Sequence, residues 1–256
     1  MSDPAPPLHT QQPTTRFSDR VADYVAHRPS YPGEAIDAVL AGLAAPSTLV
    51  AADIGAGTGI SSRLLAQRGV RVLAVEPNAA MRSGAEVHAR VQFVDGSAER
   101  TTLENGSCDL VVCAQAFHWF DHPRAFAEFA RVLKPGGRLA IVWNVRDKSD
   151  AFTAEYSRLM VHAAEGDPAG EREMDARTAA GAHAFTPFEK RSFPYAQPLT
   201  EDGLLGRAMS ASYAPKHGPR RTALERELRL LHARFASNGI ARLAYRTEVF
   251  TASLRA

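Results

Sequence analysis

The residues best suited to bind a ligand form a glycine-rich stretch, DIGAGTG, at residues 53–59. An apolar run precedes it, and a helical pattern begins directly after it at Ile60. Three glycines in five residues let the backbone turn sharply and let a ligand approach where a side chain would clash. The new helix presents free N–H groups and the positive end of its dipole toward that ligand. The stretch therefore predicts a strand, a ligand-binding loop and a helix.

An acidic residue, Glu76, lies about twenty positions further on, at the end of the next predicted strand, where a carboxylate can accept two hydrogen bonds from ribose hydroxyls. The glycine spacing differs from the G-x-G-x-x-G of nicotinamide-binding domains, because the sixth position is Ile60. Taken alone, the glycine stretch could be a tight turn that binds no ligand, and Glu76 could be a capping or surface acid. Together they predict an adenosine-type ligand.

Alternating strands and helices must position these residues. Short apolar strands in such an alternation indicate a parallel sheet covered on both faces, and ligands bind beyond the carboxyl ends of its strands. The glycine loop, Glu76, the turn 95–98 and the loop 115–119 all follow strands, so we expect them to meet in one crevice. The expected strands are 48–52, 70–75, 91–94, 109–114 and 138–143, and the expected helices are 17–28, 33–43, 60–66, 79–89 and 123–133.

The alternation breaks after residue 150. We expect two helices within 151–183, helices over 200–209 and 220–236, and two late strands over 185–195 and 243–254. The late strands are expected to form an antiparallel pair at the edge of the sheet. Asn78 and Thr200 are expected to cap the helices that follow them.

These motifs together resemble the ordered motifs of class I S-adenosylmethionine-dependent methyltransferases. The subtype is similar to the methyltransferase type 11 group of small-molecule enzymes. The resemblance covers about residues 45–145 and rests on DIGAGTG, EPN with Met81, GSAE at 96–99, SCDLV at 107–111 and LKPGG at 133–137. It implies an α/β fold with a Rossmann-like, doubly wound, mostly parallel seven-stranded sheet, an antiparallel edge strand and a helical cap or lid.

The resemblance also implies a role for each matching residue. Asp53 would lie near the methionine ammonium group, and Glu76 would hold the ribose hydroxyls. Ser97 stands where many relatives have an aspartate for the adenine amino group, so adenine would depend more on backbone groups or on Asp95. The full set of expected contacts to S-adenosyl-L-methionine is Asp53, Gly55, Ala56, Gly57, Glu76, Pro77, Met81, Ser97, Ala98, Gln115 and Arg28.

Methyl transfer from a sulfonium depends mainly on holding donor and acceptor in line, although an oxygen or nitrogen acceptor also needs a base. His118 is the candidate catalytic base, because its loop follows the fourth strand and an ordinary histidine pKa of about 6.5 suits proton removal. A structural role for His118 is the alternative. Its neighbours Phe117 and Trp119, together with Tyr24 and Tyr213, are expected to shape the substrate pocket.

Arg28 is suited to grip a carboxylate, either of the cofactor or of an acidic substrate. The alternative is a surface arginine whose neighbouring tyrosines pack a lid onto the core. No metal is expected, because His118, Asp121 and His122 lack a fourth ligand.

Composition limits the possible environment and partners. The 256 residues carry a net charge of +2 with acids and bases interspersed, so no nucleic-acid partner is expected. No apolar run reaches the roughly 18 residues that span a membrane. The two cysteines, Cys108 and Cys113, are expected on opposite faces of one strand as free buried thiols, which suits a reducing compartment. We expect a cytoplasmic monomer or homodimer that acts on a small-molecule acceptor.

The expected organisation is a flexible N-terminus (1–15), N-terminal lid helices (16–45), a cofactor-binding core (46–145) and a helical cap insertion with the C-terminal strands (146–256). The expected function is methyl transfer from S-adenosylmethionine to an oxygen, nitrogen or carbon atom of a small molecule by in-line displacement. The alternatives are a non-catalytic S-adenosylmethionine-binding protein, a relative that uses the sulfonium for other chemistry, and a nicotinamide-dependent oxidoreductase. An RNA methyltransferase is disfavoured because we find no RNA-binding module or basic patch.

Overall fold

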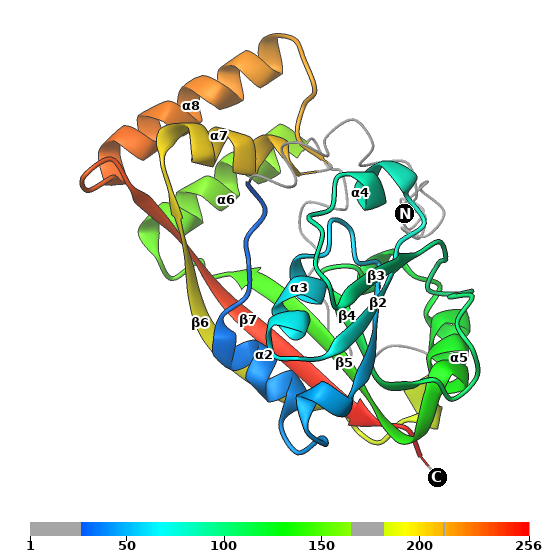
Figure 1. The fold of residues 1–256 in the computed structure, drawn as a ribbon. Helices are drawn as coiled ribbons and strands as arrows, with labels where there is room; N and C mark the ends of the chain where they lie inside the picture. The colour runs from blue at the N-terminus through cyan, green and yellow to red at the C-terminus, as the bar shows by residue number, and fades with distance from the viewer. Residues whose placement is uncertain (1–26, 165–181, 212, 256) are drawn as a thin grey trace, which may run out of the picture.

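The computed structural model describes residues 27–164, 182–211 and 213–255, which form one seven-stranded sheet with helices around it (Figure 1). The strand order is β3-β2-β1-β4-β5-β7-β6. The strands are β1 (Val50–Ile54), β2 (Arg71–Val75), β3 (Val91–Val94), β4 (Cys108–Ala114), β5 (Leu133–Arg146), β6 (Glu189–Leu199) and β7 (Ala241–Ser253).

Strands β1 to β5 run parallel, and β7 runs antiparallel to both β5 and β6. The expected Rossmann-like, mostly parallel seven-stranded sheet is therefore confirmed, and its antiparallel element lies at the expected edge. The strand order reverses between β1 and β4, since β2 and β3 extend to one side and β4 and β5 to the other. In open parallel sheets such a switch point marks the ligand-binding crevice. The glycine loop follows β1, so it lies at this switch point.

Helices cover both faces of the sheet because the strands are apolar on both sides. Leu110 and Val112 of β4 pack in one core cluster with α2 and α3, whereas Val111 and Cys113 pack in a second cluster with α5. This alternation is the two-residue period of a strand. The helices are α2 (Gly33–Leu40), α3 (Ile60–Gln67), α4 (Ala79–Ser83), α5 (His122–Val132), α6 (Ala151–Ala164), α7 (Glu201–Met209) and α8 (Pro219–Phe235).

A third core cluster joins α6, α7 and α8 to the ends of β6 and β7 that lie farthest from α5. Figure 1 shows these three helices gathered at one end of the long β6–β7 pair, away from α2, α3 and α5. We call this part, formed by α6, α7, α8 and the adjoining strand ends, the cap. None of the helices in the described ranges is long and apolar enough to cross a membrane.

Several element boundaries differ from the prediction. Helix α2 ends at Leu40 rather than residue 43, because the backbone turns extended at Ala41 and left-handed at Gly42, and Arg138 of β5 donates to the carbonyl oxygens of Val39 and Ala41 at this end. Helix α4 is shorter than expected and ends at Ser83. Strand β6 begins at residue 189 rather than 185 and continues to Leu199 along β7, and β5 begins at Leu133 rather than residue 138.

Other expectations are confirmed or lie outside the described residues. Asn78 caps α4 by accepting from the amides of Ala80 and Met81, and Thr200 caps α7 by accepting from Gly203. The first expected helix after residue 150 is α6. The expected helix that begins at residue 171 and the start of the helix at 17–28 lie outside the described ranges.

Both cysteines are free and buried, as expected, but they do not lie on opposite faces. Cys108 and Cys113 belong to the same core cluster. The pairing register between β4 and β5 shifts between Cys108 and Leu110, because Cys108 pairs with Leu133 and Leu110 pairs with Arg138, and the regular alternation of side chains is interrupted there.

Candidate functional site

The glycine loop turns directly from β1 into α3. Gly55, Gly57 and Gly59 all have left-handed backbone conformations, with φ values of 68°, 59° and 78°. At Gly55 a Cβ atom would stand 2.6 Å from the Cβ of Ala116, so the loop packs tightly against the loop that follows β4. The amides of Gly55 and Ala56 donate to the carbonyl of Val75 at the end of β2. Glycine is therefore required here by both conformation and packing.

Glu76 connects this loop to the start of α4. Its Oε2 accepts from the Gly57 amide at 2.9 Å, and its Oε1 accepts from the Asn78 amide at 2.8 Å. The residue is only 8% exposed, and burial raises the pKa of its carboxyl, although the two backbone hydrogen bonds partly oppose that shift. A carboxylate has about four acceptor positions, so Glu76 keeps capacity for further donors such as hydroxyl groups.

Asp53, the last polar residue of β1, is fully buried beneath the loop. Its Oδ2 accepts from the hydroxyls of Ser61 and Ser62 in the first turns of α3, both at 2.6 Å. Its Oδ1 is buried and has no hydrogen-bond donor within the part of the chain that is described. Burial raises the pKa of this carboxyl, and the serine hydroxyls oppose the shift. An acceptor oxygen without a donor at this place fits a ligand that brings one.

The turn after β3 completes one side of the crevice. Ser97 forms an isolated bridge with Arg100, and the side chain of Ala98 is buried in the core. Asp95 is ion-paired with Arg82, whose Nη1 also donates to the carbonyl of Glu76. Glu99 accepts from the amide of Asp121 at 2.9 Å. The turn after β3 is therefore tied both to Glu76 and to the loop after β4. Pro77 is half-buried and Met81 is buried beside this turn.

The loop after β4 holds the predicted catalytic and pocket residues. Gln115 has a left-handed backbone (φ 56°) and donates from Nε2 to the Asn144 carbonyl at 3.2 Å. His118 lies in a 3₁₀ turn, Phe117–Trp119, and its ring centroid is 4.8 Å from that of Trp119 and 4.9 Å from that of Trp143. His118 and Trp119 are half-buried.

Phe117 does not line an open pocket, which corrects the prediction for this residue. Its side chain is fully buried in the core, and its ring stacks on His122 with centroids 4.4 Å apart. In the 3₁₀ turn, neighbouring side chains point about 120° apart, so Phe117 faces inward while His118 and Trp119 do not. His122 is also held by the Phe117 carbonyl, and among the described residues no three His, Cys, Asp or Glu side chains gather as a metal site.

Arg28 lies next to the cap. Its Nη2 donates to the carbonyl of Ser210 at the end of α7, at 3.0 Å. Gln197 of β6 donates to the neighbouring His27 carbonyl at 2.9 Å, so this N-terminal segment is attached to both α7 and β6. Tyr213 is half-buried within the cap. Tyr24, the remaining expected pocket residue, lies outside the described residues.

Two residues that the sequence analysis did not single out connect these parts. The Asn144 side chain accepts from the Thr247 hydroxyl at 2.6 Å and donates to the Ser30 carbonyl at 3.0 Å. It therefore joins β5, β7 and the N-terminal segment. A polar residue inside the apolar run IVWNV is a feature by which the sequence could have indicated this role. Arg207 is buried in the cap on the same face of α7 as Leu204 and Ala208. Its place in that apolar helical stripe was a signal as well.

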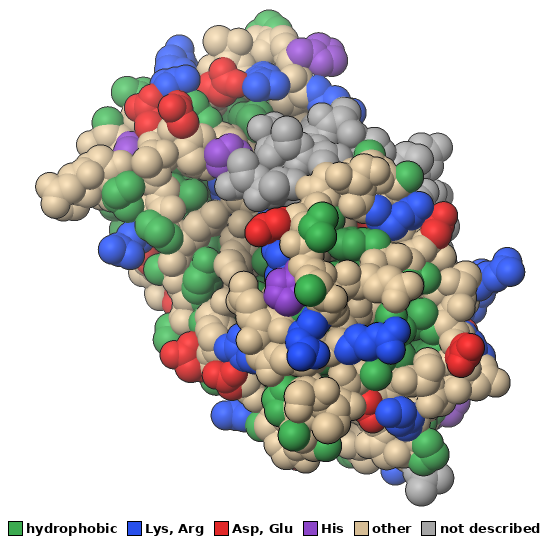
Figure 2. All heavy atoms as spheres, viewed as in Figure 1, with side chains coloured by type: hydrophobic (Ala, Val, Ile, Leu, Met, Phe, Trp, Pro, Cys, Tyr) green, Lys and Arg blue, Asp and Glu red, His purple; other side chains and the backbone are tan. Residues whose placement is uncertain are grey.

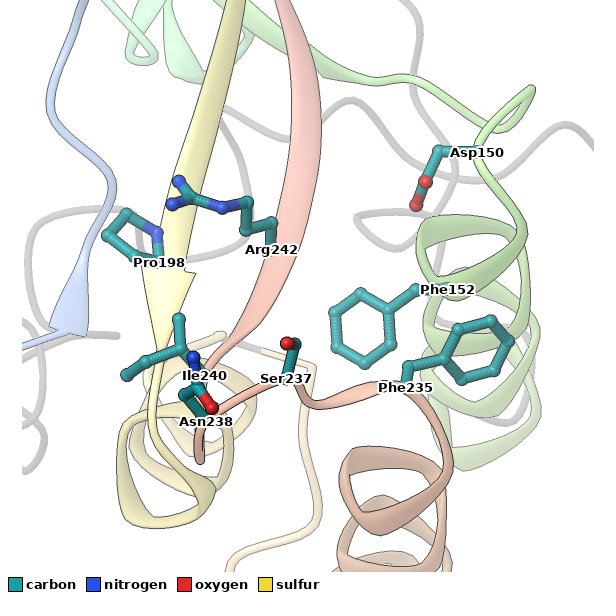
Figure 3. Close-up of a pocket in the computed structure, with 8 residues that line it drawn as sticks. All are labelled: Asp150, Phe152, Pro198, Phe235, Ser237, Asn238, Ile240 and Arg242. Carbon is teal, nitrogen blue, oxygen red and sulfur yellow. The ribbon is translucent and has the colours of Figure 1, made fainter.

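An open pocket of about 550 Å³ lies at the far side of the cap, between the start of α6, the end of α8 and the turn into β7 (Figure 3). None of the predicted site residues lines it. Its lining residues are Asp150, Phe152, Pro198, Phe235, Ser237, Asn238, Ile240 and Arg242. On the molecular face in Figure 2, basic and acidic side chains are interspersed, and no large area of a single sign stands out.

The chain is similar to named methyltransferases over nearly its whole length. A family model described as a methyltransferase domain matches residues 52–141. An uncharacterized methyltransferase of Mycobacterium tuberculosis is 37% identical over 246 residues, which cover 93% of this chain and 95% of that protein. An uncharacterized methyltransferase-like protein of Schizosaccharomyces pombe is 34% identical over 192 residues, or 73% of this chain and 74% of the relative.

Solved structures share the fold. A protein of Anaeromyxobacter dehalogenans assigned as a type II methyltransferase superposes with a TM-score of 0.60 at 27% identity, covering 90% of this chain and 98% of the other. A (4+2)-cyclase, SpnF, has a TM-score of 0.56 at 17% identity over 100% and 99% of the two chains, which shows the fold alone. The chain belongs to the class I S-adenosylmethionine-dependent methyltransferases of the type 11 group.

Proposed function

We propose that the protein transfers a methyl group from S-adenosyl-L-methionine to an oxygen, nitrogen or carbon atom of a small molecule. The observation that carries this proposal is the position of Glu76. The carboxylate is held by the amides of Gly57 and Asn78 at the switch point of the sheet, directly beside the glycine loop. A buried acceptor fixed on the loop by two backbone donors is suited to ribose hydroxyls, and family membership supplies the cofactor.

The residues around the loop fit the rest of that cofactor. The Asp53 Oδ1, which has no donor from the described residues, suits an ammonium group. Gly55, Ala56 and Gly57 present backbone rather than side chains, and Gln115 is held at the end of β4. Pro77, Met81, Ser97 and Ala98 border the place expected for adenine. When bound, S-adenosylmethionine supplies a methyl group already activated on a sulfonium.

The protein then has to orient the acceptor and, for an oxygen or nitrogen acceptor, accept its proton. We propose that an imidazole nitrogen of His118 accepts that proton. The half-buried ring contacts the indoles of Trp119 and Trp143, which restrict its orientation. A fixed base beside apolar walls suits proton removal without competition from solvent. Trp119 and Tyr213 are proposed to contact the acceptor.

Two more distant relatives are named for their acceptors, and one of these acceptors, trans-aconitate, is a small molecule. A protein of Pectobacterium atrosepticum named malonyl-(acyl-carrier protein) O-methyltransferase is 36% identical over 47% of this chain. A trans-aconitate 2-methyltransferase of Deinococcus radiodurans is 37% identical over 35% of it. The interspersed charges and the two free buried thiols support our further proposal of a cytoplasmic monomer or homodimer that does not bind nucleic acid or a membrane.

A second candidate is a protein that binds the cofactor without transferring its methyl group. The observation in its favour is the shared fold of the (4+2)-cyclase, since a protein named for another reaction has the same architecture. The two candidates agree on cofactor binding and differ only in turnover.

Calorimetry with S-adenosylhomocysteine tests the cofactor site. Replacing Glu76 with glutamine removes the charge and is expected to weaken binding by roughly 10- to 100-fold, the usual effect of losing hydrogen bonds to a charged group. Glu225→Gln is the matched control, because Glu225 pairs with Arg221 on the surface of α8. Equal affinity of wild type and Glu76→Gln would count against the site.

Incubation with methyl-labelled cofactor and panels of acids, phenols and amines tests the reaction. Labelled product from one class, reduced in a His118→Ala variant, supports catalysis with His118 as base. If the cofactor binds but no acceptor becomes labelled, the non-catalytic candidate is favoured. Binding of NADH in place of S-adenosylhomocysteine would instead support an oxidoreductase.

A further inference from the structure

The cap buries an arginine that has no carboxylate partner among the described residues. Arg207 of α7 is 9% exposed and packs with Leu204 and Ala208 on the inner face of the helix. Its Nε donates to the hydroxyl of Tyr245 at 3.2 Å. No acidic side chain of the described chain forms an ion pair with it. A buried charge without a counter-ion is strongly unfavourable in a folded protein, so its presence calls for an explanation.

Four arginines of α8 show the contrast. Arg221, Arg226, Arg229 and Arg234 each pair with a glutamate at the surface. The arginines of this set that pair with an acid therefore all lie at the surface of the cap. A buried guanidinium that served packing alone would be expected to have such a partner. The attraction between two paired charges offsets part of the cost of removing them from water, and an unpaired charge has no such compensation.

Three tyrosines lie near Arg207. Burial lowers the pKa of Arg207, but its interactions with Tyr245, Tyr156 and Tyr213 raise that pKa by more, so the guanidinium stays positively charged. Burial raises the pKa of Tyr156 to about 12, which keeps that phenol neutral. The cluster therefore combines a positive charge with phenol hydroxyls, and it holds no carboxylate from the described residues.

The guanidinium has capacity left for a ligand. An arginine has five N–H donors, and the bond to Tyr245 uses the one on Nε. No described residue accepts a hydrogen bond from the two terminal nitrogens, and the residue as a whole is 9% exposed. Two parallel N–H groups match the two oxygens of a carboxylate.

The cluster stands at the same edge of the sheet as the cofactor loop. Tyr245 of β7 pairs with Arg146 at the carboxyl end of β5, and the Arg146 guanidinium lies 5.6 Å from the ring centroid of Tyr156. Further back on β5, the carbonyl of Val142 accepts from the Gln115 amide. Val142 and Arg146 are four residues apart, about 13 Å along an extended strand. That span suits a small molecule reaching from the crevice into the cap.

We propose that Arg207, with the hydroxyls of Tyr156, Tyr213 and Tyr245, binds the carboxylate of the acceptor. The acceptor is thus a carboxylic acid whose anchored carboxylate lies at the end away from the methyl-accepting atom. This inference rests on the proposed methyl transfer, because it names the class of acceptor for the same site. The ligand supplies the counter-ion that the cap lacks.

Binding of matched acids and amides tests the proposal. Hexanoate, adipate and 3-phenylpropanoate are titrated into the full-length protein saturated with S-adenosylhomocysteine, each beside its primary amide. At least one acid is expected to bind about 10-fold or more tighter than its amide, and Arg207→Gln is expected to remove that preference. Arg229→Gln, on the surface of α8, is the matched control and should keep it. If every acid binds no tighter than its amide, the proposal is overturned.

Cofactor titrations separate this proposal from the proposed function. If wild type does not bind S-adenosylhomocysteine, the proposed function is contradicted. The comparison of acids with amides can then be repeated without S-adenosylhomocysteine, and it still tests whether Arg207 binds a carboxylate. 5′-Methylthioadenosine lacks the cofactor carboxylate. If Arg207→Gln weakens S-adenosylhomocysteine but not 5′-methylthioadenosine, Arg207 binds the cofactor carboxylate and the proposal is overturned. If Arg207→Gln does not fold, the variants Tyr245→Phe and Tyr213→Phe test the proposal instead. A loss of about 3- to 10-fold in affinity for the acid, with the affinity for its amide unchanged, supports the proposal. Unchanged affinity for the acid overturns it.

Discussion

Replacing Gly55 with alanine perturbs the point where the glycine loop meets the loop after β4. The substitution has two separate costs. The backbone at Gly55 is left-handed (φ 68°), which costs an L-residue about 1–2 kcal/mol. The new Cβ would also stand 2.6 Å from the Cβ of Ala116 and 3.3 Å from Cζ of Phe120, and overpacking of this kind costs about 1–3 kcal/mol. The sum, about 2–5 kcal/mol, is a large part of the roughly 5–15 kcal/mol that stabilises a typical protein.

Gly106→Ala is the matched control for the conformational cost. Gly106 is also left-handed (φ 57°), but a Cβ there would meet no atom within 4 Å. The difference between the two variants therefore isolates the packing cost, about 1–3 kcal/mol in urea unfolding, or roughly 2–12 °C in melting temperature for a chain of this size. Adding Ala116→Gly to Gly55→Ala removes the nearest atom and should recover part of that difference. Equal destabilisation by Gly55→Ala and Gly106→Ala, with no recovery in the double variant, would refute the packing argument.

Four further predictions concern single groups. Burial raises the pKa of Glu76 above 4.5, and a ribose contact needs the ionised carboxylate. The affinity for S-adenosylhomocysteine, measured by calorimetry, should therefore fall as the pH drops through a midpoint above 4.5. In Glu76→Gln the affinity should depend less steeply on pH. Hydrogen bonds from Arg131 lower the pKa of Glu128 to about 2, against 4.5 in the unfolded chain. The extra stability of wild type over Glu128→Gln in urea should therefore be full above pH 4.5 and disappear as the pH falls toward 2. Burial raises the pKa of both Cys108 and Cys113, so a thiol reagent should modify neither in the native protein at about pH 8 and both in urea. Thr200→Ala removes the cap of α7 and should cost about 1 kcal/mol in urea unfolding, whereas Thr200→Ser should not.

Local features of the sequence were sufficient for much of the architecture. The apolar strands, the glycine loop and the caps at Asn78 and Thr200 are determined by neighbouring residues, so their patterns are visible in a short window. The acidic residue at the end of β2 was also readable, because strand ends and glycine loops have fixed positions in a parallel sheet. The motifs indicated the family for the same reason.

Packing between distant segments decided the rest. Cys108 and Cys113 lie in one core cluster beside an irregular part of the β4–β5 pairing, and a 3₁₀ turn directed Phe117 into the core. Arg138, on a strand far along the chain, donates to the carbonyl of Ala41 at the end of α2. Polarity patterns carry no information on such contacts, because each depends on how two remote segments approach one another.

The glycine loop and Glu76 are therefore the part of the site that the sequence by itself determined. The surroundings of Arg207 were decided by the tertiary structure alone. Tyr156 of α6, Tyr213 after α7 and Tyr245 of β7 come together only when the cap folds onto the end of the sheet. An arginine in an apolar helical stripe is visible in the sequence, but the lack of a counter-ion is a property of three-dimensional packing.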